Sequence, residues 1–223
     1  MLNVMEYSGG KLAVLISGSE AQRHVGFFLK DGQEPELIHL AWHMRLSNNS
    51  TSEYVDRFGK FVAYECQNFL DEQAEDIVSF VKTIWRKNRF NVPYGIGSDS
   101  FSTFFDGEGS VSNRSPGSGL TCATFLMSVF ASQLYPVICE STWQKRPEDE
   151  EWQEMVLAEL SKKPELADHV AELRKIASSA FRYRPEEVAA CSALYDSTPI
   201  VYSDAVIFGE QLLDRVRDKG VLS

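Results

Sequence analysis

The stretch His24-Val25-Gly26-Phe27-Phe28-Leu29-Lys30-Asp31-Gly32-Gln33-Glu34-Pro35-Glu36-Leu37-Ile38-His39 has the pattern of two β-strands joined by a polar link. Both ends are apolar, and the middle carries the turn signal Asp31-Gly32. We therefore expect an antiparallel hairpin whose link is longer than minimal. Because side chains alternate along a strand, Gly26 shares a face with His24, and its missing side chain is expected to leave space beside that ring.

Further patterns extend this hairpin into an α+β fold. Apolar runs predict strands over residues 12–16, 37–44 and 58–66, and helical spacing predicts helices that begin near Asp71 and at Cys122. Beyond residue 135 the pattern is helical, with predicted helices near 147–160, over 166–181, from Pro185 and from Asp204. We expect a core over residues 1–135 and a helical C-terminal extension over 136–223 packed on that core.

The composition is that of an ordinary globular chain. The 223 residues are 43% hydrophobic and 24% charged, enough for a sizeable core, and the formal net charge of -10 argues against general affinity for nucleic acid or anionic membranes. The four cysteines are widely spaced, so we expect reduced thiols, no metal site and no cofactor. Residues 1–7 lack a signal-peptide pattern, and no apolar run is long enough to span a bilayer. Cytoplasmic residence is expected, with export by a route that needs no cleavable signal as the alternative.

Gly119-Leu120-Thr121-Cys122-Ala123-Thr124-Phe125-Leu126 places a cysteine at the start of an apolar helix. A helix N-terminus lowers the pKa of a thiol, and its unpaired backbone N–H groups can serve as an oxyanion hole. A free cysteine is often only a buried core residue. The helix-start position and the preceding Gly117-Ser118-Gly119, which lets other groups approach, favour a nucleophile instead. We therefore predict that Cys122 attacks a carbonyl carbon.

Histidines supply partners for this thiol. His24 is the candidate general base, because the pKa of imidazole lies near neutral pH. Positions 37, 39, 41 and 43 share one face of the next strand, so His39 would orient the His24 ring, with His43 as the alternative. His169 lies among charged residues and is interpreted as a surface residue.

These motifs resemble a known family. The stretch from His24 to His39 is similar to the strand–turn–strand signature of the NlpC-type cysteine peptidases, a group related to papain. Pro93-Tyr94-Gly95-Ile96-Gly97 with Leu120-Thr121-Cys122 resembles that family's second signature, in which a tyrosine precedes the nucleophilic cysteine. Here the histidine block comes first, as in the circularly permuted branch that includes the lecithin–retinol acyltransferase-like proteins. The resemblance covers residues 12–130, and it departs from the family where Thr121 replaces an aspartate and Ala123-Thr124 replaces Ser-Gly.

The resemblance implies a permuted papain-like antiparallel sheet with the cysteine-bearing helix packed on it. It implies a Cys122–His24–His39 site that cleaves a peptide or isopeptide bond through an acyl-enzyme. Tyr94 and Thr121 would be auxiliary residues at the oxyanion, and packing under a long loop explains Tyr94 equally well. The substrate would be a peptide or protein, with no nucleic acid partner and no stable membrane insertion.

Two alternatives stay open on the sequence. A thiol acyltransferase or lipid-directed hydrolase of the same fold would need an apolar acyl site, and Phe101, Phe104 and Phe105 in the loop over residues 98–118 are candidates for an apolar lid. An inactive binding module would carry a thiol whose pKa is not lowered.

Overall fold

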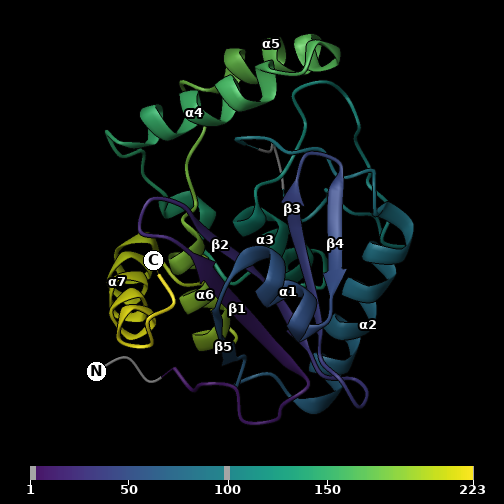
Figure 1. The fold of residues 1–223 in the computed structure, drawn as a ribbon, viewed down its shortest axis with the longest axis vertical. Helices are drawn as coiled ribbons and strands as arrows, with labels where there is room; N and C mark the ends of the chain where they lie inside the picture. Colours follow the sequence, from purple (N-terminus) through teal and green to yellow (C-terminus); the bar gives the residue numbers. More distant parts are fainter. Residues whose placement is uncertain (1–3, 98–100, 223) are drawn as a thin grey trace.

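The computed structural model describes residues 4–97 and 101–222 and has an α+β architecture built on one antiparallel sheet (Figure 1). The sheet has five strands in the order β4-β3-β2-β1-β5. The strands are β1 (Leu12–Gly18), β2 (Arg23–Leu29), β3 (Glu36–Trp42), β4 (Arg45–Asn49) and β5 (Phe61–Glu65). β2 and β3 form the expected antiparallel hairpin, with Phe27 opposite Ile38. The α+β class and the antiparallel sheet are thus confirmed.

The region between β3 and β5 differs from the sequence expectation. A tight turn leads from β3 into β4, which the sequence did not predict because its residues are polar and lack an apolar alternation. Helix α1 (Thr51–Phe58) follows, with Ser50 as N-cap and Glu53 completing a capping box. The strand expected over residues 58–66 therefore begins only at Phe61.

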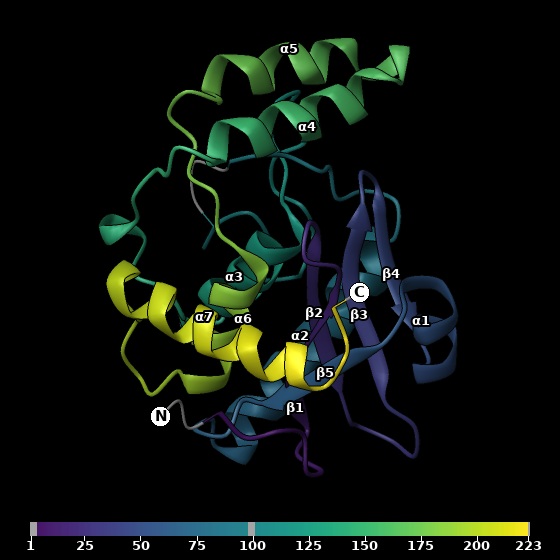
Figure 2. The same cartoon turned by 60° about the vertical axis from the view of Figure 1, so that its left-hand side comes forward.

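Side-chain alternation gives the sheet two buried faces. The larger cluster lies between one face and three helices, α2 (Asp71–Asn88), α3 (Cys122–Ser132) and α6 (Pro185–Leu194). The smaller cluster joins Tyr54 of α1 to Leu15 and Phe28 on the other face. Figure 2 shows α1 and α3 on opposite sides of the sheet. Residues 122–131 of α3 are all buried, as expected for a helix that is apolar on every side.

The C-terminal part is helical, as expected, and contributes to the same core. Besides α6, its elements are α4 (Asp149–Ser161), α5 (Ala167–Ile176), α7 (Tyr202–Asp218) and short 3-10 turns at Glu140–Thr142 and Pro164–Leu166. α6 and α7 lie beside the sheet, whereas α4 and α5 stand beyond its end (Figures 1 and 2). The main hydrophobic cluster continues from Val14 of β1 to Val188 of α6. None of the helices in the described ranges combines the length and apolar character that crossing a bilayer requires.

The loop before Cys122 is closed at its base by backbone pairing. Tyr94 and Leu120 form a parallel β-bridge. The N–H of Gly95 donates to the Leu120 carbonyl at 3.1 Å, and the Leu120 N–H donates to the Pro93 carbonyl at 3.0 Å. A Cβ added to Gly119 would lie only 2.7 Å from the Gly95 nitrogen, so the two chain segments meet backbone to backbone. This pairing brings Tyr94 close to the start of α3.

The phenylalanines of this loop are core residues and do not form the expected lid. Phe101, Phe104 and Phe105 are all buried in the main cluster, and the Phe105 ring contacts Phe125 edge-on at 6.1 Å between centroids. Residues 98–100, which begin the predicted loop, lie outside the described residues. Residues 1–3, which entered the argument against a signal peptide, lie outside them as well.

Candidate active site

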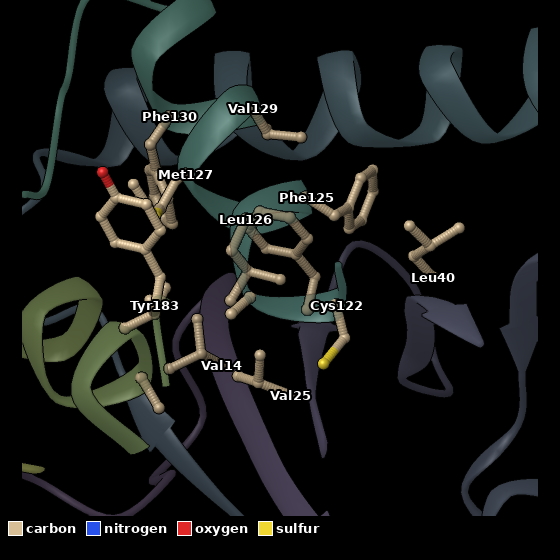
Figure 3. Packing of buried hydrophobic residues seen from close by; sticks show 14 of the residues in the cluster. Val14, Val25, Leu40, Cys122, Phe125, Leu126, Met127, Val129, Phe130 and Tyr183 are labelled. Carbon is tan, nitrogen blue, oxygen red and sulfur yellow. The ribbon is translucent and has the colours of Figure 1, made fainter. Parts of the chain in front are cut away.

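Cys122 is the first residue of α3, as predicted, and its helix start is held by a capping box. The Thr121 hydroxyl accepts from the Thr124 N–H at 3.1 Å, and the Thr124 hydroxyl accepts from the Thr121 N–H at 2.7 Å. The Thr121 side chain therefore serves as a helix cap beside the nucleophile. Figure 3 shows the Cys122 sulfur pointing away from α3 on the side of Val25. Only 5% of Cys122 is exposed.

Burial dominates the acidity of this thiol. Desolvation raises the pKa of Cys122 to about 11 and outweighs the lowering effects of the nearby backbone N–H groups of Val25, Ala123 and Cys122 and of the positive charge of Arg182. The expectation of a lowered pKa was therefore wrong, because the helix-start argument omits the cost of removing a thiolate from water. At neutral pH Cys122 is a protonated thiol.

The two predicted histidines and an asparagine form a hydrogen-bonded chain. His24 Nε2 lies 2.8 Å from His39 Nδ1, and His39 Nε2 lies 3.1 Å from Asn49 Oδ1. An amide oxygen only accepts, so His39 Nε2 carries the proton and His39 Nδ1 accepts from His24 Nε2–H. This order leaves the lone pair on Nδ1 of His24, the atom that a general base uses. Asn49 was missed because β4 itself was not predicted.

Gly26 lets the two histidines meet. The paired part of β2 and β3 ends at Phe27 and Ile38, so His24 and His39 lie just outside it. A Cβ on Gly26 would lie 2.7 Å from the Cβ of His39. The space left by Gly26 is therefore filled by His39, and the expectation that it stays open beside the His24 ring was wrong.

The other two histidines hold the backbone of Tyr94. His43 Nδ1 accepts from the Tyr94 N–H at 3.3 Å, and His169 Nε2 donates to the Tyr94 carbonyl at 2.8 Å. His43 leaves the face of His39 because an irregularity at Leu40 and Trp42 ends the strand alternation. His169 is buried and bonded, so its interpretation as a surface residue was wrong.

These residues line one cavity of about 600 Å³ at the end of the sheet. Cys122, His24, Thr121 and Tyr94 all contribute to its wall. The C-terminal part supplies the opposite wall through Trp152, Met155, Val156, Arg182 and Tyr183. The sequence did not indicate these wall residues, because they come from segments far from the motif. Within the described ranges, no hydrogen bond joins the Cys122 sulfur to the His24 ring. Such catalytic contacts often form only when substrate binds.

Tyr94 lines the same cavity as Cys122. The centroid of its ring is 4.5 Å from that of Trp42, which orients the phenol. Burial raises the pKa of Tyr94, and ionisation of Cys122 to the thiolate raises it further. The Tyr94 hydroxyl therefore stays protonated and available as a hydrogen-bond donor at neutral pH. Tyr94 is thus both a packed aromatic and a residue of the cavity.

Acid is expected to destabilise the fold through His39. Burial lowers the pKa of His39 from 6.5 to about 4. Between pH 6.5 and about pH 4, His39 is therefore protonated in the unfolded chain but neutral in the folded chain. The free energy of unfolding falls as the pH falls through this range. From pH 7 to pH 5 the loss through His39 is about 2 kcal/mol. Urea unfolding at both pH values measures it, and His39→Gln, which keeps donor and acceptor groups but does not titrate, should show a drop smaller by that amount. Equal drops in the two proteins would contradict the prediction.

Among the described residues, no three His, Cys, Asp or Glu side chains group as ligands for a metal ion. The side chains on the cavity wall include the thiol of Cys122, the imidazole of His24, the phenol of Tyr94, the guanidinium of Arg182 and the carboxylate of Glu159. No protein-family model, no curated protein and no solved structure matches this chain.

Proposed function

We propose that the protein is a cysteine hydrolase that cleaves an amide bond of a peptide or protein through an acyl-enzyme on Cys122. The observation that carries this proposal is the meeting of two parts in one cavity. One part is the thiol of Cys122 at the start of α3, which lines the cavity. The other is the chain from His24 through His39 to Asn49, which leaves a basic nitrogen on His24. Together they match the roles of nucleophile, base and orienting groups.

The acidity of the two groups determines how the thiol is activated. Burial lowers the pKa of His24 well below its ordinary value, while that of Cys122 is raised. The resting pair is therefore neutral thiol and neutral imidazole. His24 Nδ1 takes the thiol proton as the sulfur–carbon bond forms, so the nucleophile is generated in the presence of substrate.

The remaining steps use groups on the same cavity wall. The oxyanion of the tetrahedral intermediate is stabilised by the Cys122 backbone N–H and the Tyr94 hydroxyl. His24 returns its proton to the leaving amine, and the carbon–nitrogen bond breaks to leave a thioester on Cys122. A water molecule, deprotonated by His24, then attacks the thioester and releases the acid and the thiol. His39 holds the His24 ring throughout by accepting its Nε2–H.

The proposed family is the circularly permuted NlpC-type branch. Its support is the order of the elements, with the histidine hairpin of β2 and β3 before the cysteine of α3, and the packing of α3 against the sheet. Thr121 departs from the family's usual aspartate. In this chain Thr121 caps α3, a role that an aspartate side chain also fills well.

A thiol acyltransferase or a lipid-directed hydrolase is the second candidate. The observation in its favour is the apolar wall that α4 gives to the cavity through Trp152, Met155 and Val156. An acyl chain would pack on this wall, while the attack by Cys122 would be unchanged. An inactive binding module would use the same cavity without turnover, and the raised pKa of Cys122 is the observation in its favour.

Detection of the acyl-enzyme tests the proposal and separates these candidates. The protein is incubated with coumarin amides of short peptides and with fatty acyl p-nitrophenyl esters. Intact-mass analysis should then find a thioester on Cys122, with release of coumarin from the amides. Cys122→Ala should lose both signals, and Cys139→Ala, at a half-buried cysteine that does not line the cavity, should keep them. Acylation by esters alone would favour the second candidate. Hydrolysis that is unchanged in Cys122→Ala would refute cysteine catalysis.

A further inference from the structure

Arg182 lies on the wall of the candidate active site and takes part in no ion pair among the described residues. It belongs to the segment between α5 and α6, and it lines the same cavity as Cys122 and Tyr94. Its guanidinium carbon lies 4.7 Å from the centroid of the Trp152 ring. Stacking on this indole fixes the plane of the guanidinium without using its N–H groups. The donors of Arg182 thus remain available to a ligand.

The carboxylates around Arg182 are bound to other cations. The two whose charges act on Arg182 are Glu186, which pairs with Arg23 at 2.9 Å, and Asp149, which pairs with Arg146 at 3.7 Å. Glu159, the carboxylate on the cavity wall, pairs with Lys162. In the described part of the chain, the Arg182 guanidinium makes neither a hydrogen bond nor an ion pair, and its Nε is buried without a partner. A half-buried cation with unsatisfied donors is costly unless an anion completes it. The cavity therefore offers a position for one anion.

This position lies next to the point of attack. The positive charge of Arg182 acts on the Cys122 sulfur and on the Tyr94 phenol, lowering the pKa of each. Burial and the neighbouring cation Arg184 lower the pKa of Arg182 itself. Arg182, Cys122 and Tyr94 line the same cavity of about 600 Å³. A bound anion would be close enough to belong to the same substrate molecule as the acyl group.

We propose that Arg182 binds a carboxylate of the substrate beside the carbonyl that Cys122 attacks, which makes it a residue that determines specificity. A planar guanidinium binds a carboxylate through two parallel N–H bonds. The second arginine on the cavity wall, Arg23, is already bonded to Glu186. One free guanidinium matches the single charge of a carboxylate better than the double charge of a phosphate. This inference rests on the proposed function, and it narrows the substrate to a peptide with an acidic side chain or a free carboxyl terminus near the scissile bond.

Two matched alkylating reagents test this inference without turnover. Iodoacetate carries a negatively charged carboxylate, and iodoacetamide carries a neutral carboxamide in its place. With either reagent the Cys122 sulfur displaces iodide from the methylene carbon, the thiol proton passes to solvent, and iodide leaves. The rate at Cys122 is followed by peptide mass mapping, so that the other three cysteines do not contribute. The quantity compared is the iodoacetate rate divided by the iodoacetamide rate at pH 8.

In Arg182→Gln this ratio is expected to fall about tenfold, because a hydrogen bond to a charged group is lost. Arg182→Lys, which keeps the charge but not the two parallel donors, should give an intermediate ratio. A ratio that is equal in the three proteins would overturn the proposal. So would an equal slowing of both reagents, because Arg182 would then act only on the thiol.

A second measurement uses the unmodified protein and does not depend on how the variants fold. Sodium acetate should slow the alkylation of Cys122 by iodoacetamide more than sodium chloride does at equal ionic strength. Protection by inorganic phosphate but not by acetate would overturn the carboxylate assignment. Absence of an acyl-enzyme with any substrate would instead refute the proposed function, while the ratio would still report on Arg182.

Discussion

His24→Ala is expected to reduce kcat/KM for the substrate that acylates Cys122 by roughly 10³-fold, the range that a general base supplies. The effect is large because the Cys122 thiol, with a pKa of about 11, is almost entirely protonated at neutral pH. Without a base next to the sulfur, the thiolate must form at its equilibrium population. Steady-state kinetics at pH 7 measure the change. The loss should shrink as the pH is raised toward 10, because hydroxide then supplies the thiolate.

Two controls identify the cause of that loss. Imidazole added to the solution should restore part of the activity of His24→Ala by entering the space of the missing ring. It should restore none in His24→Ala combined with Cys122→Ala. The double variant should also be no slower than Cys122→Ala alone, since nucleophile and base act as a unit. Retention of more than a tenth of the activity in His24→Ala would exclude His24 as the base.

Gly119→Ala is expected to destabilise the fold by about 3 kcal/mol, at the upper end of overpacking effects. The added Cβ would lie 2.7 Å from the Gly95 nitrogen, 2.8 Å from the Tyr94 carbonyl carbon and 2.9 Å from the Pro93 oxygen. All three contacts are with backbone atoms, which cannot rotate away as a flexible side chain does. The paired segments must therefore separate, and the free energy of unfolding in urea measures the cost.

The same substitution should lower activity beyond its effect on stability. Tyr94 lies in the segment that Gly119 contacts, and Cys122 begins the helix that follows. A shift of about 1 Å between them is expected to cost roughly 10²-fold in kcat/KM. Gly107→Ala is the matched control, because its Cβ would meet nothing within 4 Å. It should stay within about 0.5 kcal/mol of the unmodified protein. Equal stability of the two variants would contradict the close backbone approach.

Local patterns of the sequence were sufficient for the elements that carry the two main candidates. The apolar run from His24 to Leu29 predicted the strand of His24, and Asp31-Gly32 predicted the hairpin link. The apolar run after Cys122 predicted the helix that Cys122 begins. These features depend on neighbouring residues along the chain, through apolar runs and the turn or cap signals that bound them. They are therefore readable without knowledge of the partners.

Features that depend on distant residues were not readable in this way. Asn49 completes the histidine chain from a polar strand that has no apolar alternation. His169 and Arg182 come from the C-terminal part and reach Tyr94 and the cavity only through the packing of the chain. His39, and not His43, is the partner of His24, because an irregularity between Leu40 and Trp42 moves His43 off the face of His39. A strict strand alternation does not predict this irregularity.

Local patterns along the chain were enough to predict the antiparallel hairpin, the helical C-terminal part and the place of Cys122 at a helix start. The partner of His39, the surroundings of Arg182 and the acidity of the thiol depend on segments that only folding brings together. The reason is that a pKa depends on burial and on charges brought near by folding. The raised pKa of Cys122 results from desolvation that outweighs the N–H groups of its own helix.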